Sequence, residues 1–260
     1  MNGNTPNTNS SAFVLGALLA LGLIVGGWVT GAEIKATRLS DRYVTVKGLV
    51  ERQVKSDLAI WPIGYKEAGD DLKLVSAKTE SDRQAILQFL EQQDIKSSEI
   101  EAGVVRVVDT QANEFGGPNR PAHRYIVEQQ LTVHTSRVDQ VAMASQKTMQ
   151  LLQKGIVLSS NPGQATGQGP SYKFTGLNAI KPDMITEATR NARAAAERFA
   201  LDSGSKVGSI RQANQGVFSI LPADQGSDTS EDGGMMYSNA DASLMKKVRI
   251  VSSIEYYLEK

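Results

Sequence analysis

The feature that most constrains this chain is a long uncharged stretch near its N-terminus. No residue from Asn2 to Ala32 has a charged side chain, and the residues from Ala12 to Val29 are almost all apolar. An apolar stretch of about 20 residues is long enough to cross a bilayer as a helix. The pattern therefore predicts a polar tail over 1–11, a transmembrane anchor over 12–32, a linker over 33–41 and a globular body over 42–260.

A cleaved secretory signal peptide is the alternative to a retained anchor. Thr30 and Ala32 would form an acceptable small-residue cleavage site. Residues 1–11, however, contain no Lys or Arg, and the apolar stretch is long for a signal peptide. Trp28 lies at one end of the stretch, where an indole ring favours the membrane interface. These features favour an anchor that stays on the mature protein.

Two pairs of glycines within the expected anchor are candidates for packing between membrane helices. Gly22 pairs with Gly26, and Gly27 pairs with Gly31, each at a spacing of four residues. Small residues at this spacing let two helix backbones approach closely in lipid. Because glycine is common in membrane helices, a segment with no specific partner is the alternative.

The sequence gives two opposing signals about the orientation of the body. Lys35, Arg38 and Arg42 follow the anchor, which by the positive-inside rule would place the body in the cytoplasm. Glu33 and Asp41 dilute this cluster. The chain also lacks cysteine, which fits an exported protein without proving export.

The composition of the chain excludes several classes of function. The 28 basic and 28 acidic side chains give a net charge of zero, so electrostatic binding to nucleic acid is not expected. Two histidines and no cysteines leave few ligands for a transition metal. We therefore expect no metal, no other cofactor and no nucleic-acid partner.

The pattern of the body predicts an α+β fold with helices packed on mixed or antiparallel sheets. Alternation and β-branched residues predict strands over 42–50, 58–66, 104–108, 125–133, 171–177 and 244–258, with one or two more within 206–220. Spacings of three and four residues predict helices over 71–93, from 136 to Gly155, and from Pro182 to Asp202. A short strand over 72–75 before a helix from Ser81 is the alternative at the first of these.

Several local features refine this prediction. Pro62 indicates an edge position or a bulge in its strand, and Ser136 with Asp139 forms a variant capping box. Phe89 and Leu90 are expected core residues. In the last helix, one side carries small and apolar residues that would let it lie close to a sheet: Ile185, Ala188, Ala192, Ala195, Ala196 and Phe199. The stretches 58–108 and 123–177 each read as strand, helix, strand, and a cleft between them is a possible ligand site.

No arrangement of residues typical of catalysis is found. His123 and His134 are separated by an odd number of residues, so on one strand they would lie on opposite faces. The carboxylate pairs Asp70 with Asp71 and Glu99 with Glu101 do not define a general acid and base. The sequence therefore predicts no enzymatic site.

The body resembles the SIMPL-domain family, which includes periplasmic immunogenic proteins of bacteria. The resemblance covers roughly Arg42 to Leu258 and rests on the order of local patterns: Tyr43–Gly48, Leu87–Ile95, Glu99–Ile100, Tyr125–Val133 with Val138, Glu187–Ala196 and Gly204–Gly208. The family often has glycine where this chain has Asp94, and a simpler acidic-proline turn where this chain has residues 54–57.

The resemblance implies an envelope protein without catalytic residues that forms a homo-oligomeric, ring- or cage-like assembly linked to stress tolerance. It also favours a single-pass inner-membrane protein with its body in the periplasm, against the weak positive-inside signal for a cytoplasmic body. We therefore expect a membrane-anchored, non-enzymatic envelope protein whose partners are other copies of itself and the lipid bilayer around residues 12–32. An envelope protein that binds a small molecule or peptide is the alternative.

Overall fold

The computed structural model describes residue 16 and residues 18–24, 26–28, 42–112, 122–159, 169–224 and 240–259. Within the expected anchor, the described residues are helical, and the rest of 12–32 lies outside the described ranges. No helix within the described ranges is both long enough and apolar enough to span a bilayer. The anchor therefore stays a prediction.

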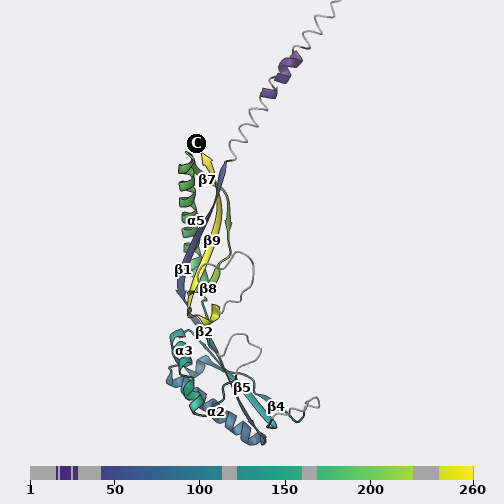
Figure 1. Ribbon diagram of the computed structural model, residues 1–260, viewed down its shortest axis with the longest axis vertical. Helices are drawn as coiled ribbons and strands as arrows, with labels where there is room; N and C mark the ends of the chain where they lie inside the picture. The colour runs from purple at the N-terminus through teal and green to yellow at the C-terminus, as the bar shows by residue number, and fades with distance from the viewer. Residues whose placement is uncertain are drawn as a thin grey trace, which may run out of the picture. The chain divides into compact units, whose positions relative to one another are not determined.

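The body has the predicted α+β fold, with two sheets and helices packed on them (Figure 1). One sheet has the order β1 (Tyr43–Lys55), β9 (Met245–Glu259), β7 (Lys206–Gln215), and β8 (Ser219–Pro222) also pairs with β9. The other has the order β3 (Ile100–Ala102), β5 (Tyr125–Thr135), β2 (Leu58–Gly69), β6 (Ser171–Lys173), and β4 (Arg106–Asp109) also pairs with β5. The helices are α2 (Leu72–Gln92), α3 (Val138–Gln146), α4 (Met149–Gln153) and α5 (Leu177–Asp202), with short 3-10 turns at Ser97–Glu99 and Ala240–Ala242.

The chain forms two compact units whose boundary falls within β1, α5 and β9. Unit 1 consists of Met1–Leu49, Thr186–Gly216 and Val251–Lys260, and unit 2 consists of Val50–Ile185 and Val217–Ile250. Each unit therefore combines segments that are far apart in the sequence.

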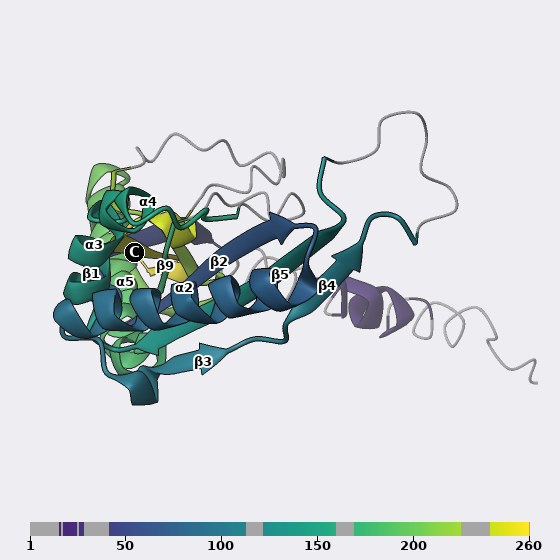
Figure 2. The ribbon, with the colours of Figure 1, turned by 90° about the horizontal axis from the view of Figure 1, so that it is seen from below.

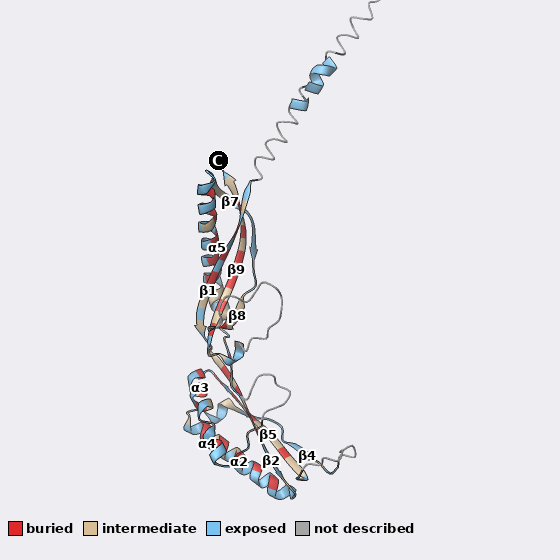
Figure 3. Ribbon diagram, viewed as in Figure 1, coloured by how far each residue is buried: buried red, intermediate tan, exposed pale blue. Residues whose placement is uncertain are grey.

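The core of unit 1 is built from small residues. Alanines at every fourth position of α5 are almost completely buried: Ala188, Ala192, Ala196 and Ala200. Of these, Ala192 and Ala196 form one cluster with Val46, Ile254 and Tyr256 of the sheet. Figure 3 shows the buried residues along this helix. A Cβ atom on Gly48 would lie 1.9 Å from the carbonyl oxygen of Ala188. The helix therefore packs directly against the backbone of β1, as the alanines predicted.

The core of unit 2 is built from large residues. Helix α2 lies along the face of the sheet formed by β2 and β5 (Figure 2). The largest side chains between them are fully buried: Trp61, Tyr65, Ile86, Phe89, Leu90 and Leu131. The prediction that Phe89 and Leu90 are core residues is confirmed.

Helix α2 begins where the sequence predicted, because Asp71 caps it. The Asp71 carboxylate accepts hydrogen bonds from the backbone N–H groups of Lys73 at 2.8 Å and Leu74 at 3.3 Å. Such a cap satisfies N–H groups that have no partner within the helix. The alternative of a short strand over 72–75 is wrong.

Two predicted helix starts are wrong, and the helix from 136 to Gly155 is split into α3 and α4. The cap position of α3 is Arg137, whose side chain makes no capping hydrogen bond. Asp139 pairs instead with Lys55 at 2.6 Å.

Helix α5 begins at Leu177, so Pro182 lies inside it. The Asp57 carboxylate accepts from the N–H groups of Thr175 and Gly176 at 2.8 and 3.0 Å, a contact that no local pattern predicts.

The stretches 58–108 and 123–177 do not form separate units with a cleft between them. β2 and β5 pair antiparallel along their whole length, from Ala59 opposite Thr135 to Gly69 opposite Tyr125, so both stretches share one sheet. β2 lies between β5 and β6, but at Pro62 its second side has no strand partner in the described ranges, so the edge position predicted for this residue is confirmed. On the side away from β5, β6 pairs with β2 only as far as Ile60, and the next bridge is at Tyr65.

Candidate functional site

The expected helix-packing glycines lie only partly in the described ranges. Gly22, Gly26 and Gly27 lie in helical residues, and Gly31 lies outside the described ranges. A Cβ atom on any of the first three would meet no described atom within 4 Å other than those of its chain neighbours and its own helix backbone. Their role in contacts between copies stays a prediction.

The titratable side chains that the sequence singled out are dispersed into separate pairs. His123 lies 3.6 Å from Asp70, and His134 lies 3.8 Å from Glu101. Asp71 caps α2. No group of three or more His, Cys, Asp or Glu side chains in the described part of the chain is placed to hold a metal ion.

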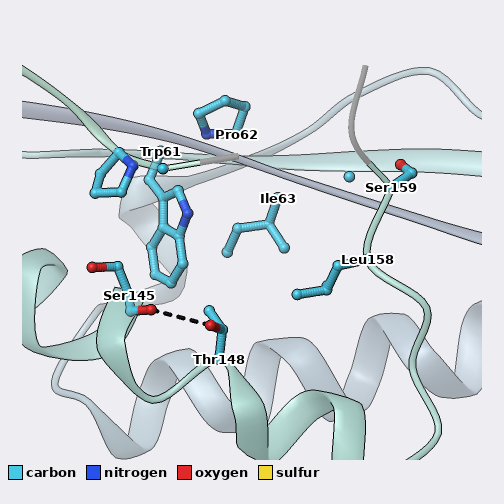
Figure 4. A pocket seen from close by; sticks show the side chains of 10 residues that line it. Trp61, Pro62, Ile63, Ser145, Thr148, Leu158 and Ser159 are labelled. Carbon is cyan, nitrogen blue, oxygen red and sulfur yellow. Dashed lines mark hydrogen bonds between the residues drawn. The ribbon is translucent and has the colours of Figure 1, made fainter. Parts of the chain in front are cut away.

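One cavity of about 200 Å³ lies beside the open stretch of β2 at Pro62. Figure 4 shows the apolar side chains of Trp61, Ile63 and Leu158 in its lining, with Ser145 and Thr148 close together and Ser159 beside Leu158. The Ser145 hydroxyl donates to the Ala142 carbonyl at 2.9 Å, and the Thr148 hydroxyl donates to the Ser145 carbonyl at 3.1 Å. No described residue that lines this cavity is an acid or a base, so it offers no group to activate a hydroxyl nucleophile.

A second cavity, of about 560 Å³, lies at the end of α2. Leu87, Ile95 and Ile100 give it an apolar side, and its polar lining includes Glu91, Asp94, Lys96 and Arg137. This cavity could accommodate a small ligand with both apolar and charged groups.

Arg137 is held in place at this cavity by Glu99. The Glu99 carboxylate pairs with the Arg137 guanidinium and accepts hydrogen bonds from the Thr135 hydroxyl at 2.7 Å and the Lys96 N–H at 2.8 Å. Partial burial raises the pKa of Glu99, but these hydrogen bonds outweigh burial and keep it below its usual value. Sequence reasoning did not identify Arg137, because its partner lies 38 residues away.

A valine-rich edge of the second sheet is the most exposed apolar feature near a strand. The exposed fractions are 92% for Val104 and 49% for Val105, which lie just before β4, and 49% for Val107 within it. β4 pairs with β5 on one side, and no strand in the described ranges pairs with its other side. We call residues 103–109 the valine edge. The sequence predicted a strand here but gave no signal that it would be exposed.

Comparison with known proteins identifies one family. The family described as "SIMPL: Protein of unknown function (DUF541)" matches the chain over residues 44–254. A search of curated proteins finds no match to the chain. The function of this family is unknown, and the match includes segments of both units. The chain therefore belongs to the SIMPL family.

Proposed function

We propose that this chain is a non-enzymatic envelope protein, anchored in the inner membrane through residues 12–32, that assembles with copies of itself into a closed homo-oligomer. The observation that carries the proposal is the valine edge. An exposed, apolar strand edge is a template for pairing with another strand. Proteins that remain monomeric usually protect such an edge with charges, prolines or a covering segment.

The valine edge has little of this protection. Arg106 is its one basic side chain, and Asp109 is already paired with Arg124 at 3.1 Å. A strand added beside β4 would gain backbone hydrogen bonds and bury Val105 and Val107. Zero net charge gives little long-range repulsion between copies.

A second copy also offers a different edge for the same contact. On the far side of this sheet, residues 157–159 run beside β2, with Lys66 N–H donating to the Val157 carbonyl at 3.1 Å. Val157 is 50% exposed. Pairing of two different edges is head-to-tail and can close into a ring, whereas pairing of identical edges gives a two-fold dimer. The availability of two edges supports the ring.

The proposed anchor would strengthen such an assembly. Confinement to a membrane raises the effective concentration of the bodies, so a weak contact between edges becomes sufficient.

N-terminal sequencing of membrane-extracted protein should begin at or near Met1, and a start at Glu33 would contradict the anchor. Protease added to spheroplasts should digest the body if it lies in the periplasm. Protection until lysis would place it in the cytoplasm.

The assembly is tested by placing a charge on the valine edge of the full-length protein in detergent. Val105→Lys and Val107→Lys should reduce the particle mass measured by mass photometry, because a desolvated ammonium opposes strand pairing. Leu74→Lys is the matched control, since Leu74 is a 71% exposed apolar residue on α2. It should leave the mass unchanged. A wild-type protein that is monomeric at micromolar concentration would contradict the proposal.

The second cavity favours one other function, binding of a small molecule or peptide. Its apolar side and the braced Arg137 would suit a short peptide with an apolar side chain and a free carboxylate. Titration of the protein with leucyl-leucine, followed by NMR, should then shift resonances of Leu87 and Ile100. A monomeric protein that binds this dipeptide would favour this function over assembly.

A further inference from the structure

A carboxylate oxygen of Asp82 is buried without a hydrogen-bond partner beneath α2. The Asp82 residue is 4% exposed, and its Oδ1 pairs with the ammonium of Lys78. No hydrogen bond from the described residues reaches its Oδ2. A buried acceptor without a donor costs about 1–3 kcal/mol, and more when it is charged. The described residues therefore supply no donor for this oxygen.

A second carboxylate shares the same lysine. Lys78 Nζ lies 3.6 Å from Oε1 of Glu67, which comes from β2, and the Glu67 side chain is 18% exposed. With all three side chains ionised, the group would have a net charge of −1, with both carboxylates mostly buried and the Lys78 side chain 47% exposed. One added proton would make it neutral and would supply the missing donor.

We infer that Glu67, Lys78 and Asp82 form a proton-binding site that couples the docking of α2 on β2 to pH. The bound proton lies between the two carboxylates and donates to Asp82 Oδ2. Burial, followed by the hydrogen bond with Asp82, raises the pKa of Glu67 above its ordinary value of 4.5. This inference is independent of self-assembly.

The other titratable or charged groups near this face do not compete for the proton. Glu80 and Arg83 on α2 pair with each other at 2.6 Å, so together they add no net charge. Tyr65 on β2 is neutral, because burial raises the pKa of its phenol. Tyr125 on β5 stands opposite Gly69, further along the same face.

The expected direction follows from the position of the proton. The folded chain holds the Glu67 proton more tightly than the unfolded chain, so protonation stabilises the docked helix. This contribution is complete below pH 4.5, the ordinary pKa, and is lost as the pH rises through the raised pKa. Acidification should therefore tighten the first half of α2.

Hydrogen exchange of the full-length protein in detergent tests the coupling. Exchange at backbone amides of residues 73–82, corrected for the intrinsic dependence on pH, is measured between about pH 5 and pH 8. Protection in the wild type should rise as the pH falls, by at most about tenfold per pH unit, because opening releases the one extra proton that the folded site holds. Glu67→Gln should show high protection at every pH, because its amide donates to Asp82 without a charge.

Two controls isolate the site. Glu91→Gln removes an exposed carboxylate from the same helix, and His123→Gln removes the histidine beside Asp70, just before α2. Both variants should keep the wild-type dependence on pH. If Glu67→Gln retains that dependence, or loses protection at neutral pH, the inference is overturned. Carbon-13 titration of the wild-type Glu67 carboxyl gives a direct check that needs no variant. A midpoint above 4.5 supports the site, and one at or below 4.5 overturns it.

Discussion

Units 1 and 2 both pack a helix on an antiparallel sheet, but they do so with opposite kinds of side chain. In unit 1, α5 contacts the sheet through alanines, and at Gly48 the two backbones nearly touch. In unit 2, α2 is separated from the sheet by a layer that includes Trp61, Tyr65 and Phe89. The same type of layer is therefore stabilised by close approach of backbones in one unit and by side-chain volume in the other.

This difference predicts opposite responses to mutation. A core of large side chains loses stability when atoms are removed, because a cavity remains. A core of small side chains loses stability when atoms are added, because helix and sheet must separate.

The largest effect is expected from shortening a side chain in unit 2. Phe89 is 1% exposed, so Phe89→Ala should lower the free energy of unfolding by about 3–5 kcal/mol. Thermal unfolding of the full chain measures the loss, and hydrogen exchange should locate it in unit 2. Leu74→Ala, at a 71% exposed position of the same helix, is the control and should have little effect. Equal losses for both variants would show that α2 does not contribute the core described here.

The next effect is expected from adding one carbon atom to unit 1. Gly48→Ala would place its Cβ 1.9 Å from the carbonyl oxygen of Ala188 and 2.9 Å from the backbone nitrogen of Ala192. Because these neighbours are backbone atoms, α5 must shift, and we expect a loss of about 3 kcal/mol. Thermal unfolding measures it, with hydrogen exchange of α5 to show that the loss lies in unit 1.

A matched pair on α5 sharpens this test. Ala192 is completely buried, whereas Ala194 is exposed, so the same change to Leu is made on opposite sides of one helix. Ala192→Leu should destabilise the protein and Ala194→Leu should not. Two neutral results would mean that α5 can move away from β1 without cost.

The sequence predicted the periodic parts of this comparison and missed the contacts between distant residues. The spacing of Ala188, Ala192 and Ala196 predicted the close-packed side of α5, although Phe199, placed on the same side, is 60% exposed. The extent of α2 and its core residues Phe89 and Leu90 were also predicted, whereas the cap at Asp71 is a finding of the structure. The start of α5 depends on Asp57, which is 118 residues from Thr175, and a single sequence carries no signal of such a pairing. The same limit applies to the candidate site. The pairing of Arg137 with Glu99 and the exposure of the valine edge both depend on residues that are distant in the sequence.

One of these distant contacts gives a prediction that depends on pH. Glu99→Gln removes a carboxylate that accepts from Arg137, Thr135 and Lys96, and should cost about 2 kcal/mol at neutral pH. The pKa of Glu99 is held below 4.5, so its contribution is present above pH 4.5 and is lost as the pH falls through the lowered pKa. The difference in unfolding midpoint between wild type and variant should therefore shrink in acid. A difference that stays constant down to pH 2 would mean that the charge of Glu99 is not what stabilises this contact.

The smallest effect is expected at the start of α2, where stabilisation is local and does not depend on core volume. Asp71→Ala removes the acceptor for the N–H groups of Lys73 and Leu74 and should cost about 1 kcal/mol. Asp71→Asn keeps a side-chain oxygen at the cap and should cost only a few tenths of that amount. Hydrogen exchange should show faster exchange in the first turn of α2 for the alanine variant alone, with Phe89 and its neighbours unaffected. If the alanine variant instead loosens the whole helix, α2 depends on its cap as much as on its large side chains, and the contrast between the two units is weaker than their packing implies.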